Sequence, residues 1–162
     1  MASGCFWGRE YHFRQLPGVI SARTGFVGGK AVAPTYQQVC SENTGHAETV
    51  EVVYDLRKLT TEALLVEFFT LHDFTEDRSE DGGQYRSAIF LPRHEPHGLA
   101  QEKVALKMLA TLREEGMIPT TQLRWEEHFY PADSRHQQYC STRGIVPKKR
   151  EMEAVREILT FK

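Results

Sequence analysis

A cysteine within the run Gly-Cys-Phe-Trp-Gly, near the N-terminus, is well suited to nucleophilic chemistry. Cys5 stands just before a stretch predicted to be helical, so the free N–H groups and the positive dipole end of that helix would face its sulfur. Both features stabilise a thiolate, lower its pKa and make it a nucleophile near neutral pH. The competing interpretation is a buried, inert cysteine among core aromatics, as free cysteines often are. Gly4 and Gly8 favour the reactive interpretation, because they let the backbone approach the sulfur closely.

A glutamate on an apolar strand face could supply a proton. Residues 46 to 54 alternate, which places Glu48 on the same face as Val50, Val52 and Tyr54. A carboxyl group desolvated on such a face has a raised pKa and can act as a general acid. In the alternative interpretation the start of the strand frays into water and Glu48 is exposed, which is the commoner situation for a lone glutamate.

Two tyrosines stand at chain breaks where their hydroxyl groups could reach a substrate. Tyr36 follows a Pro-Thr break, and Tyr85 opens a predicted strand after a Gly-Gly turn. A phenolic hydroxyl there could donate a hydrogen bond to a polarised oxygen. Tyrosines at such positions are also common as half-buried packing residues, so neither is decisive alone.

Two other kinds of enzyme share part of these patterns. His46-Ala47-Glu48 matches half of the zinc nucleobase-deaminase signature, but Cys140 lacks the second cysteine that the Pro-Cys-x-x-Cys half needs. The chain has three cysteines and no Cys-x-x-Cys pair, so we expect no metal site. A cysteine-dependent hydrolase or amidotransferase, with Cys5 activated by one of seven histidines, stays open as the alternative function.

The elements that must position these residues alternate between helix and strand, which predicts an α/β (α+β) fold with a mixed sheet flanked by helices. We expect helices over 6–16, up to about residue 40, after the N-cap Thr60, up to Gly116 and near the C-terminus. We expect strands over 19–26, 46–54, 85–91 and 121–125. No repeat or linker divides the chain, so residues 1–162 are predicted to form a single catalytic domain.

The overall composition excludes several classes of partner. With 20 Lys plus Arg and 22 Asp plus Glu the net charge is −2, and 148–150 is the one short basic run, so we expect no nucleic-acid partner. No apolar run is long enough to span a bilayer, and no N-terminal signal pattern is present. An odd number of cysteines suits a reducing compartment, which predicts a cytoplasmic protein; we expect a monomer.

The candidate residues fall in an ordered set of motifs that resembles one family, the type A peptide methionine sulfoxide reductases. The motifs lie at residues 4–8, 25–29, 34–36, 39–41, 44–48, 82, 84–89, 129–132 and 136–139. The resemblance implies a two-layer α/β sandwich that reduces the S epimer of methionine sulfoxide, free or in oxidised proteins, and so acts in protein repair under oxidative stress. It implies no metal or organic cofactor.

The resemblance also assigns roles to single residues. Cys5 is similar to the family's nucleophile, which becomes a sulfenic acid as methionine leaves, and Glu48 to the acid that protonates the sulfoxide oxygen. Tyr36 and Tyr85 match the positions that bind this oxygen. A further thiol must then regenerate the nucleophile, and in much of the family a C-terminal cysteine does so and is itself reduced by thioredoxin.

The residues for substrate binding and for recycling of Cys5 match the family's motifs only in part. Phe6 and Trp7 match the family's apolar pocket for the S-methyl group. Where the family usually has an aspartate that contacts the substrate backbone, this chain has Glu80 followed by Asp81. The Gly-rich stretch that often carries the recycling cysteine is absent, which leaves Cys140 as the late candidate.

Two routes of recycling therefore stay open. Cys140 resolves the sulfenic acid, or an external thiol such as thioredoxin or dithiothreitol reduces Cys5 directly. Cys40 lies in a motif that the family does not generally use for recycling. Only three residues precede Gly4, so we expect that the first strand is short or that the chain is truncated.

Overall fold

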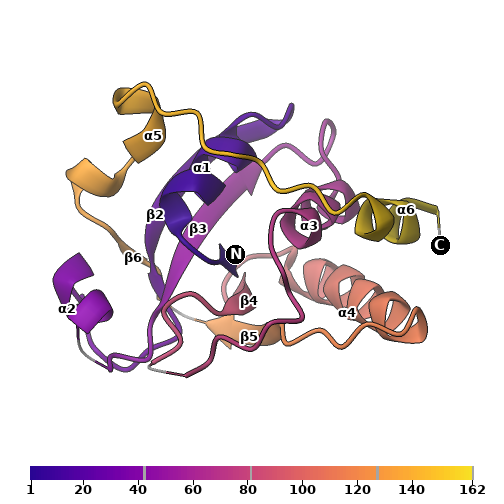
Figure 1. Ribbon diagram of the computed structural model, residues 1–162, viewed down its shortest axis with the longest axis horizontal. Coiled ribbons are helices and arrows are strands. Elements are labelled where there is room, and N and C mark those ends of the chain that lie inside the picture. The colour runs from indigo at the N-terminus through magenta and orange to yellow at the C-terminus, as the bar shows by residue number, and fades with distance from the viewer. Residues whose placement is uncertain (42, 81, 127, 162) are drawn as a thin grey trace.

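Two three-stranded sheets form the centre of the molecule, and helices surround them (Figure 1). The computed structural model describes residues 1–41, 43–80, 82–126 and 128–161. In the first sheet the strand order is β1 (Ala2–Ser3), β4 (Ser87–Pro92) and β5 (Gln122–Glu126). In the second sheet it is β3 (Ala47–Tyr54), β2 (Val19–Val27) and β6 (Tyr130–Pro131).

The short first strand joins the two sheets edge to edge. The Met1 nitrogen donates to the Val50 carbonyl at 2.8 Å, and the Val50 N–H donates to the Met1 carbonyl at 2.9 Å. The β4–β5 pair is parallel and the other strand pairs are antiparallel. The predicted α/β class with helices around mixed strands is confirmed, but the strands divide into two small sheets that meet at Met1.

The helices occupy both ends of the sheets. They are α1 (Phe6–Arg14), α2 (Tyr36–Ser41), α3 (Thr61–Thr70), α4 (Gly98–Glu114), α5 (Tyr139–Thr142) and α6 (Glu153–Phe161), with a 3₁₀ turn at Ser134–His136. In Figure 1, α1 covers β2 and β3, whereas α3, α4 and α6 pack together beside β4 and β5. The chain between α5 and α6 crosses the outer face of α1, where Pro147 lies 3.5 Å from the place a Cβ on Gly8 would take.

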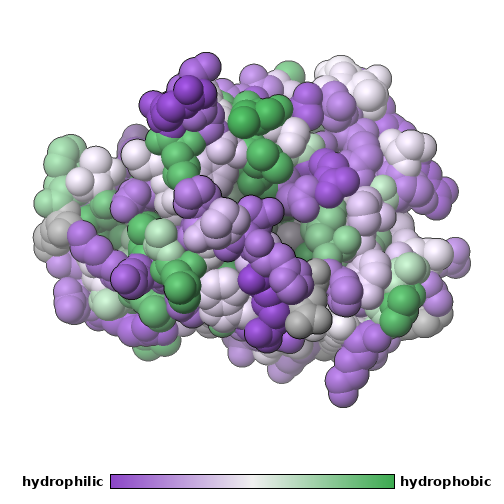
Figure 2. All heavy atoms as spheres, turned by 180° about the vertical axis from the view of Figure 1, so that it is seen from behind, coloured by the Kyte–Doolittle hydropathy of each residue, from purple (hydrophilic) through white to green (hydrophobic). Residues whose placement is uncertain are grey.

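Aromatic side chains fill the space between these layers. The largest fully buried apolar side chains include Phe6, Phe13, Phe26, Phe68, Phe69 and Phe74. Each such burial removes apolar surface from water and stabilises the fold by roughly 1.5–3 kcal/mol. Thr60 caps α3 as predicted, because its hydroxyl accepts the Ala63 N–H at 3.1 Å. Seen from behind, polar and apolar side chains are interspersed over the surface (Figure 2).

Two predicted boundaries are wrong. The first helix ends at Arg14 rather than Leu16, because the N–H of Leu16 turns back to the Phe13 carbonyl before Pro17. Tyr85 does not open a strand, since β4 begins at Ser87. The preceding Gly-Gly turn extends through Arg86, whose backbone N–H and guanidinium both donate to the Gly83 carbonyl. Among the described residues, no helix is long and apolar enough to cross a membrane.

Candidate active site

Cys5 is the N-cap of α1, at the exposed end of the turn that leads from β1 into the helix. Gly4 makes this turn with φ +90°, a conformation that L side chains rarely adopt. The backbone N–H groups of Trp7 and Gly8 face the sulfur and lower the pKa of the Cys5 thiol, as the helix start predicts. Partial burial and the carboxylate of Glu48 raise it more, with burial as the larger cause.

The net effect raises the pKa of Cys5 above its ordinary value, so the expectation of a lowered pKa is wrong. The physical reason is that the helix supplies two oriented N–H groups, whereas the tertiary structure withdraws water from the sulfur and places an acid next to it. Cys5 is therefore a thiol at neutral pH until a proton acceptor takes its proton.

Glu48 is buried, with 1% of its surface exposed, at the second position of β3. Its Oε2 accepts the N–H of Phe6, the residue directly after Cys5, at 3.0 Å. Its Oε1 accepts a hydrogen from the Gln84 side chain at 2.9 Å. Burial raises the pKa of Glu48, and these two hydrogen bonds oppose the rise without cancelling it. The strand alternation thus places a carboxyl group with a raised pKa beside the cysteine.

Gln84 is a site residue that reasoning from the sequence missed. Its Nε2 donates to Glu48 and also, at 3.2 Å, to the sulfur of Cys40. The Gln84 carbonyl accepts the Glu48 N–H at 2.9 Å, which fixes the register between the two segments. The sequence offered one signal for this role, because Gln84 directly precedes Tyr85, a candidate site residue. Cys40, which the sequence argument set aside, is exposed and lies at this site.

The two tyrosines both lie within electrostatic reach of Glu48 and Cys40. Tyr36 is half-buried at the start of α2; burial, followed by a hydrogen-bonding contact with Cys40, raises its pKa above the ordinary value. Tyr85 is 40% exposed, and burial of its hydroxyl end together with the charge of Glu48 raises its pKa to about 12. Both hydroxyl groups therefore keep their protons at neutral pH and can donate hydrogen bonds.

Aromatic rings form one side of the site. Trp7 is half-buried and stacks on Tyr139 with ring centroids 3.8 Å apart. His136 stacks on Tyr36 at 4.1 Å and accepts the indole N–H of Trp7 at 3.2 Å. Phe6 lies beneath them, with 1% of its surface exposed. Trp7 thus presents an apolar face that is held in place by stacking, and Phe6 supports the cluster from the core.

Cys140 lies on α5 and is buried, with 5% of its surface exposed. Its thiol donates to the carbonyl of Trp7 at 3.5 Å. Helix carbonyls point toward the C-terminal end of a helix, whereas Cys5 caps the N-terminal end of α1. The Cys140 thiol therefore contacts the carbonyl side of the first turn of α1, two residues after Cys5.

Of the two acidic residues predicted to contact the substrate, Glu80 is among the described residues. The Glu80 side chain is exposed, and its backbone carbonyl accepts the Gly83 N–H at 2.9 Å in the turn before the site. Asp81 lies outside the described residues.

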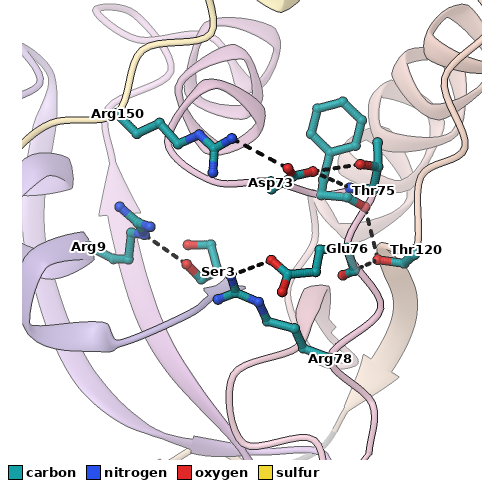
Figure 3. Close-up of polar contacts among 9 residues, drawn as sticks. Ser3, Arg9, Asp73, Thr75, Glu76, Arg78, Thr120 and Arg150 are labelled. Carbon is teal, nitrogen blue, oxygen red and sulfur yellow. Dashed lines mark hydrogen bonds and ion pairs between the residues drawn. The ribbon is translucent and has the colours of Figure 1, made fainter.

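An arginine stands one helical turn after Cys5. Arg9 Nε donates to the Ser3 carbonyl at 2.8 Å, and the positive charge of Arg9 lowers the pKa of Cys5, though less than burial raises it (Figure 3). Arg78 approaches the same glycine turn, with a nitrogen 3.7 Å from the place of a Cβ on Gly4. Figure 3 also shows Arg78 paired with Glu76. The positive charges near Cys5 thus come from two directions.

A cleft in the molecule lies apart from this site. A cleft of about 400 Å³ between β3, β4 and the start of α3 is lined by residues such as Val52 and Leu91 and by none of the candidate site residues. Among the described residues, no group of three or more histidine, cysteine or acidic side chains is arranged to hold a metal ion.

Comparison with known proteins gives one consistent family. The sequence model described as "Peptide methionine sulfoxide reductase" matches residues 1–159. The chain is 44% identical over 146 residues to the mitochondrial peptide methionine sulfoxide reductase of Homo sapiens, covering 85% of this chain and 60% of that protein. It is 41% identical over 149 residues to the peptide methionine sulfoxide reductase MsrA of Acidobacterium capsulatum, covering 88% and 92%.

Solved structures agree with the sequence relatives. Methionine sulfoxide reductase A of Corynebacterium diphtheriae superposes with a TM-score of 0.75 at 32% identity, covering 88% of this chain and 73% of that one. Reduced Mxr1 of Saccharomyces cerevisiae superposes with a TM-score of 0.77 at 27% identity, covering 93% and 90%.

Proposed function

Because this chain belongs to the peptide methionine sulfoxide reductase family, we propose that it reduces methionine S-sulfoxide to methionine at Cys5. One observation of the site carries the proposal. The buried carboxyl group of Glu48 accepts the N–H of the residue directly after Cys5, so an acid with a raised pKa lies beside the sulfur. A sulfoxide needs a nucleophile for its sulfur and a proton for its oxygen, and this pair supplies both.

Burial raises the pKa of both Cys5 and Glu48, which favours the protonated form of each group. The Cys5 sulfur attacks the sulfoxide sulfur while Glu48 gives its proton to the sulfoxide oxygen. The carboxylate that results takes the proton of the thiol, so Glu48 ends as it began. The oxygen then moves from the methionine sulfur to the Cys5 sulfur: the S–O bond to methionine and the transient bond between the two sulfurs break, an S–O bond to Cys5 forms, and methionine leaves Cys5 as a sulfenic acid. A thiol and a sulfoxide thus become a sulfenic acid and a thioether, without any metal or organic cofactor.

Binding of the substrate follows from the same side chains. The hydroxyl groups of Tyr36 and Tyr85 donate to the sulfoxide oxygen as it gains negative charge. The face of Trp7 covers the S-methyl group, which has no polar partner to satisfy. These contacts hold the oxygen and the methyl group on opposite sides of the sulfur, and such an arrangement selects one epimer.

Regeneration of Cys5 needs a reductant, and we propose a thioredoxin-like protein or a small dithiol such as dithiothreitol. Its substrates are oxidised proteins and free methionine sulfoxide. The chain spans 60% of the length of the human relative, so features of the remaining part of that relative are not transferred.

The test is turnover of the purified protein on methionine S-sulfoxide and on its R epimer, with dithiothreitol as reductant. We expect methionine from the S epimer alone and none from a well-folded Cys5→Ser variant, since a serine hydroxyl is not ionised appreciably at neutral pH. Methionine formation by Cys5→Ser would refute the assignment. Hydrolysis of an ester or amide that depends on Cys5, without any sulfoxide reduction, would establish the cysteine-hydrolase alternative instead.

A further inference from the structure

We propose that Cys40 resolves oxidised Cys5 by forming a Cys5–Cys40 disulfide inside the site, a step that rests on the proposed reductase function. Cys40 is positioned by α2, where it follows Tyr36 by four residues, so both side chains lie on the same face of the helix. Cys40 is exposed and contacts the hydroxyl group of Tyr36, one of the two proposed oxygen-binding groups. A second thiol therefore already lies in the substrate site.

A chain of hydrogen bonds links Cys40 to the residue directly after Cys5. The Gln84 Nε2 donates both to Cys40 Sγ at 3.2 Å and to Glu48 Oε1 at 2.9 Å. Glu48 Oε2 in turn accepts the N–H that follows Cys5 at 3.0 Å. Tyr85 lies within electrostatic reach of both sulfurs. One amide and one carboxyl group therefore separate Cys40 from the backbone of the nucleophile.

The position of Gln84 also suits the chemistry of a resolving thiol. Its side-chain amide contacts both Cys40 Sγ and Glu48 Oε1, so it holds the Cys40 sulfur next to the acid of the site. Glu48 regains its proton in the first step, so it can protonate the oxygen that leaves Cys5 in the second step, and its carboxylate then takes the proton of the Cys40 thiol. The groups that reduce the sulfoxide are thus also placed to assist the second step.

The attachment of α2 permits the small movement that a disulfide needs. The Cα atoms of a disulfide lie within about 7 Å of each other. The α2 helix has six residues and buries Val39 alone. The two ends of the segment that carries α2 are joined by one hydrogen bond, in which the Lys30 N–H donates to the Thr44 carbonyl at 3.1 Å. Displacing α2 toward Cys5 therefore disturbs the stacking of Tyr36 on His136 but exposes little buried apolar surface of the helix.

Cys140 is held more firmly. Its helix is fixed by the stacking of Tyr139 on Trp7 and by the Gln138 N–H, which donates to the buried carboxyl group of Glu10 at 2.8 Å. Burial raises the pKa of Cys140, and the nearby Glu10 raises it further. Reaching Cys5 would cost these contacts and would also remove Tyr139 from Trp7. For these reasons the geometry favours Cys40 over the late cysteine.

The atoms and electrons of the step balance. The Cys40 sulfur attacks the Cys5 sulfur, a sulfur–sulfur bond forms and the bond from Cys5 to oxygen breaks. The oxygen leaves with the proton of the sulfenic acid and the proton of the Cys40 thiol, as water. The oxidant is the methionine sulfoxide of the first step, and the product is a disulfide that a dithiol reductant can open.

The experiment is a turnover without reductant. Pre-reduced protein receives excess methionine S-sulfoxide, free thiols are blocked with N-ethylmaleimide, and released methionine, intact mass and linked peptides are measured. Wild type, Cys40→Ser and Cys140→Ser are compared; serine can still accept the Gln84 hydrogen. A parallel sample receives hydrogen peroxide in place of the sulfoxide, which oxidises Cys5 independently of reductase activity.

We expect a loss of two hydrogens and a Cys5–Cys40 linked peptide in wild type and in Cys140→Ser. Cys40→Ser should instead gain one oxygen on Cys5. A Cys5–Cys140 peptide in wild type, or an oxygen on Cys5 with Cys40 alkylated, would overturn the inference. Absence of released methionine would contradict the proposed function alone, and the peroxide sample would then decide the role of Cys40 by the same peptides.

Discussion

Replacing Glu48 with glutamine separates its chemical role from its structural role. Glutamine keeps the size of the side chain and one oxygen that can accept the Phe6 N–H. In the wild type this N–H donates to Glu48 Oε2 at 3.0 Å. It cannot transfer a proton to the sulfoxide oxygen. General acid catalysis is typically worth about 10²- to 10⁴-fold, or about 3–5 kcal/mol of activation free energy. We expect methionine formation in a single turnover of Glu48→Gln to slow by that factor.

The same substitution should change how the stability of the fold depends on pH. Burial raises the pKa of Glu48 in the folded state, so the folded state binds more protons than the unfolded state. The wild type therefore loses stability as pH rises from the unfolded pKa through the raised folded pKa, whereas the neutral glutamine loses none from this position. The difference in unfolding free energy between variant and wild type should grow from about pH 4 upward.

The assay combines rapid-quench measurement of methionine with urea unfolding at pH 4, 6 and 8. Glu51→Gln is the matched control, because Glu51 lies on the same strand and pairs with Arg23 at the surface. That control should leave the single-turnover rate near wild type. A Glu48→Gln protein that folds stably and forms methionine at the wild-type rate would show that the proton comes from another group.

Three further predictions concern the aromatic face, the core and a helix cap. Trp7→Ala should raise the KM for methionine sulfoxide and should cost less unfolding free energy than the roughly 3–5 kcal/mol of a core tryptophan, because the indole is half-buried. Enzyme kinetics and urea unfolding measure the two effects. A loss of about 3–5 kcal/mol with unchanged kinetics would mark a core tryptophan. Burial lowers the pKa of His72 to about 3, so its folded form binds fewer protons than its unfolded form. Wild-type stability should therefore fall as pH drops from about 6.5 toward 3, and His72→Gln should flatten that slope; equal slopes would contradict the assignment. Thr60→Ala should cost about 1 kcal/mol and lower Tm, since the cap of α3 loses its bond to Ala63.

The sequence by itself determined the features that depend on short spacings. The Gly-Cys-Phe-Trp-Gly run predicted a cysteine at a helix start, and Cys5 is the N-cap of α1. Alternation along residues 46 to 54 predicted a carboxyl group on an apolar face, and Glu48 is buried. Thr60 was identified as a cap from its place before an apolar helix. Caps, strand alternation and helix periodicity are set by neighbours in the chain, so they can be read from it.

Tertiary structure alone decided how these residues act on one another. Gln84 reaches Glu48 across 36 positions of sequence and Cys40 across 44, and no local pattern encodes such contacts. The direction of the pKa shift of Cys5 reversed for the same reason, because desolvation and the Glu48 carboxyl group come from segments that fold against the helix start. Reasoning from the sequence named Cys140 as the recycling candidate and set Cys40 aside. Packing places Cys40 at the site and Cys140 behind Trp7, since a thiol's environment depends on what surrounds it in space.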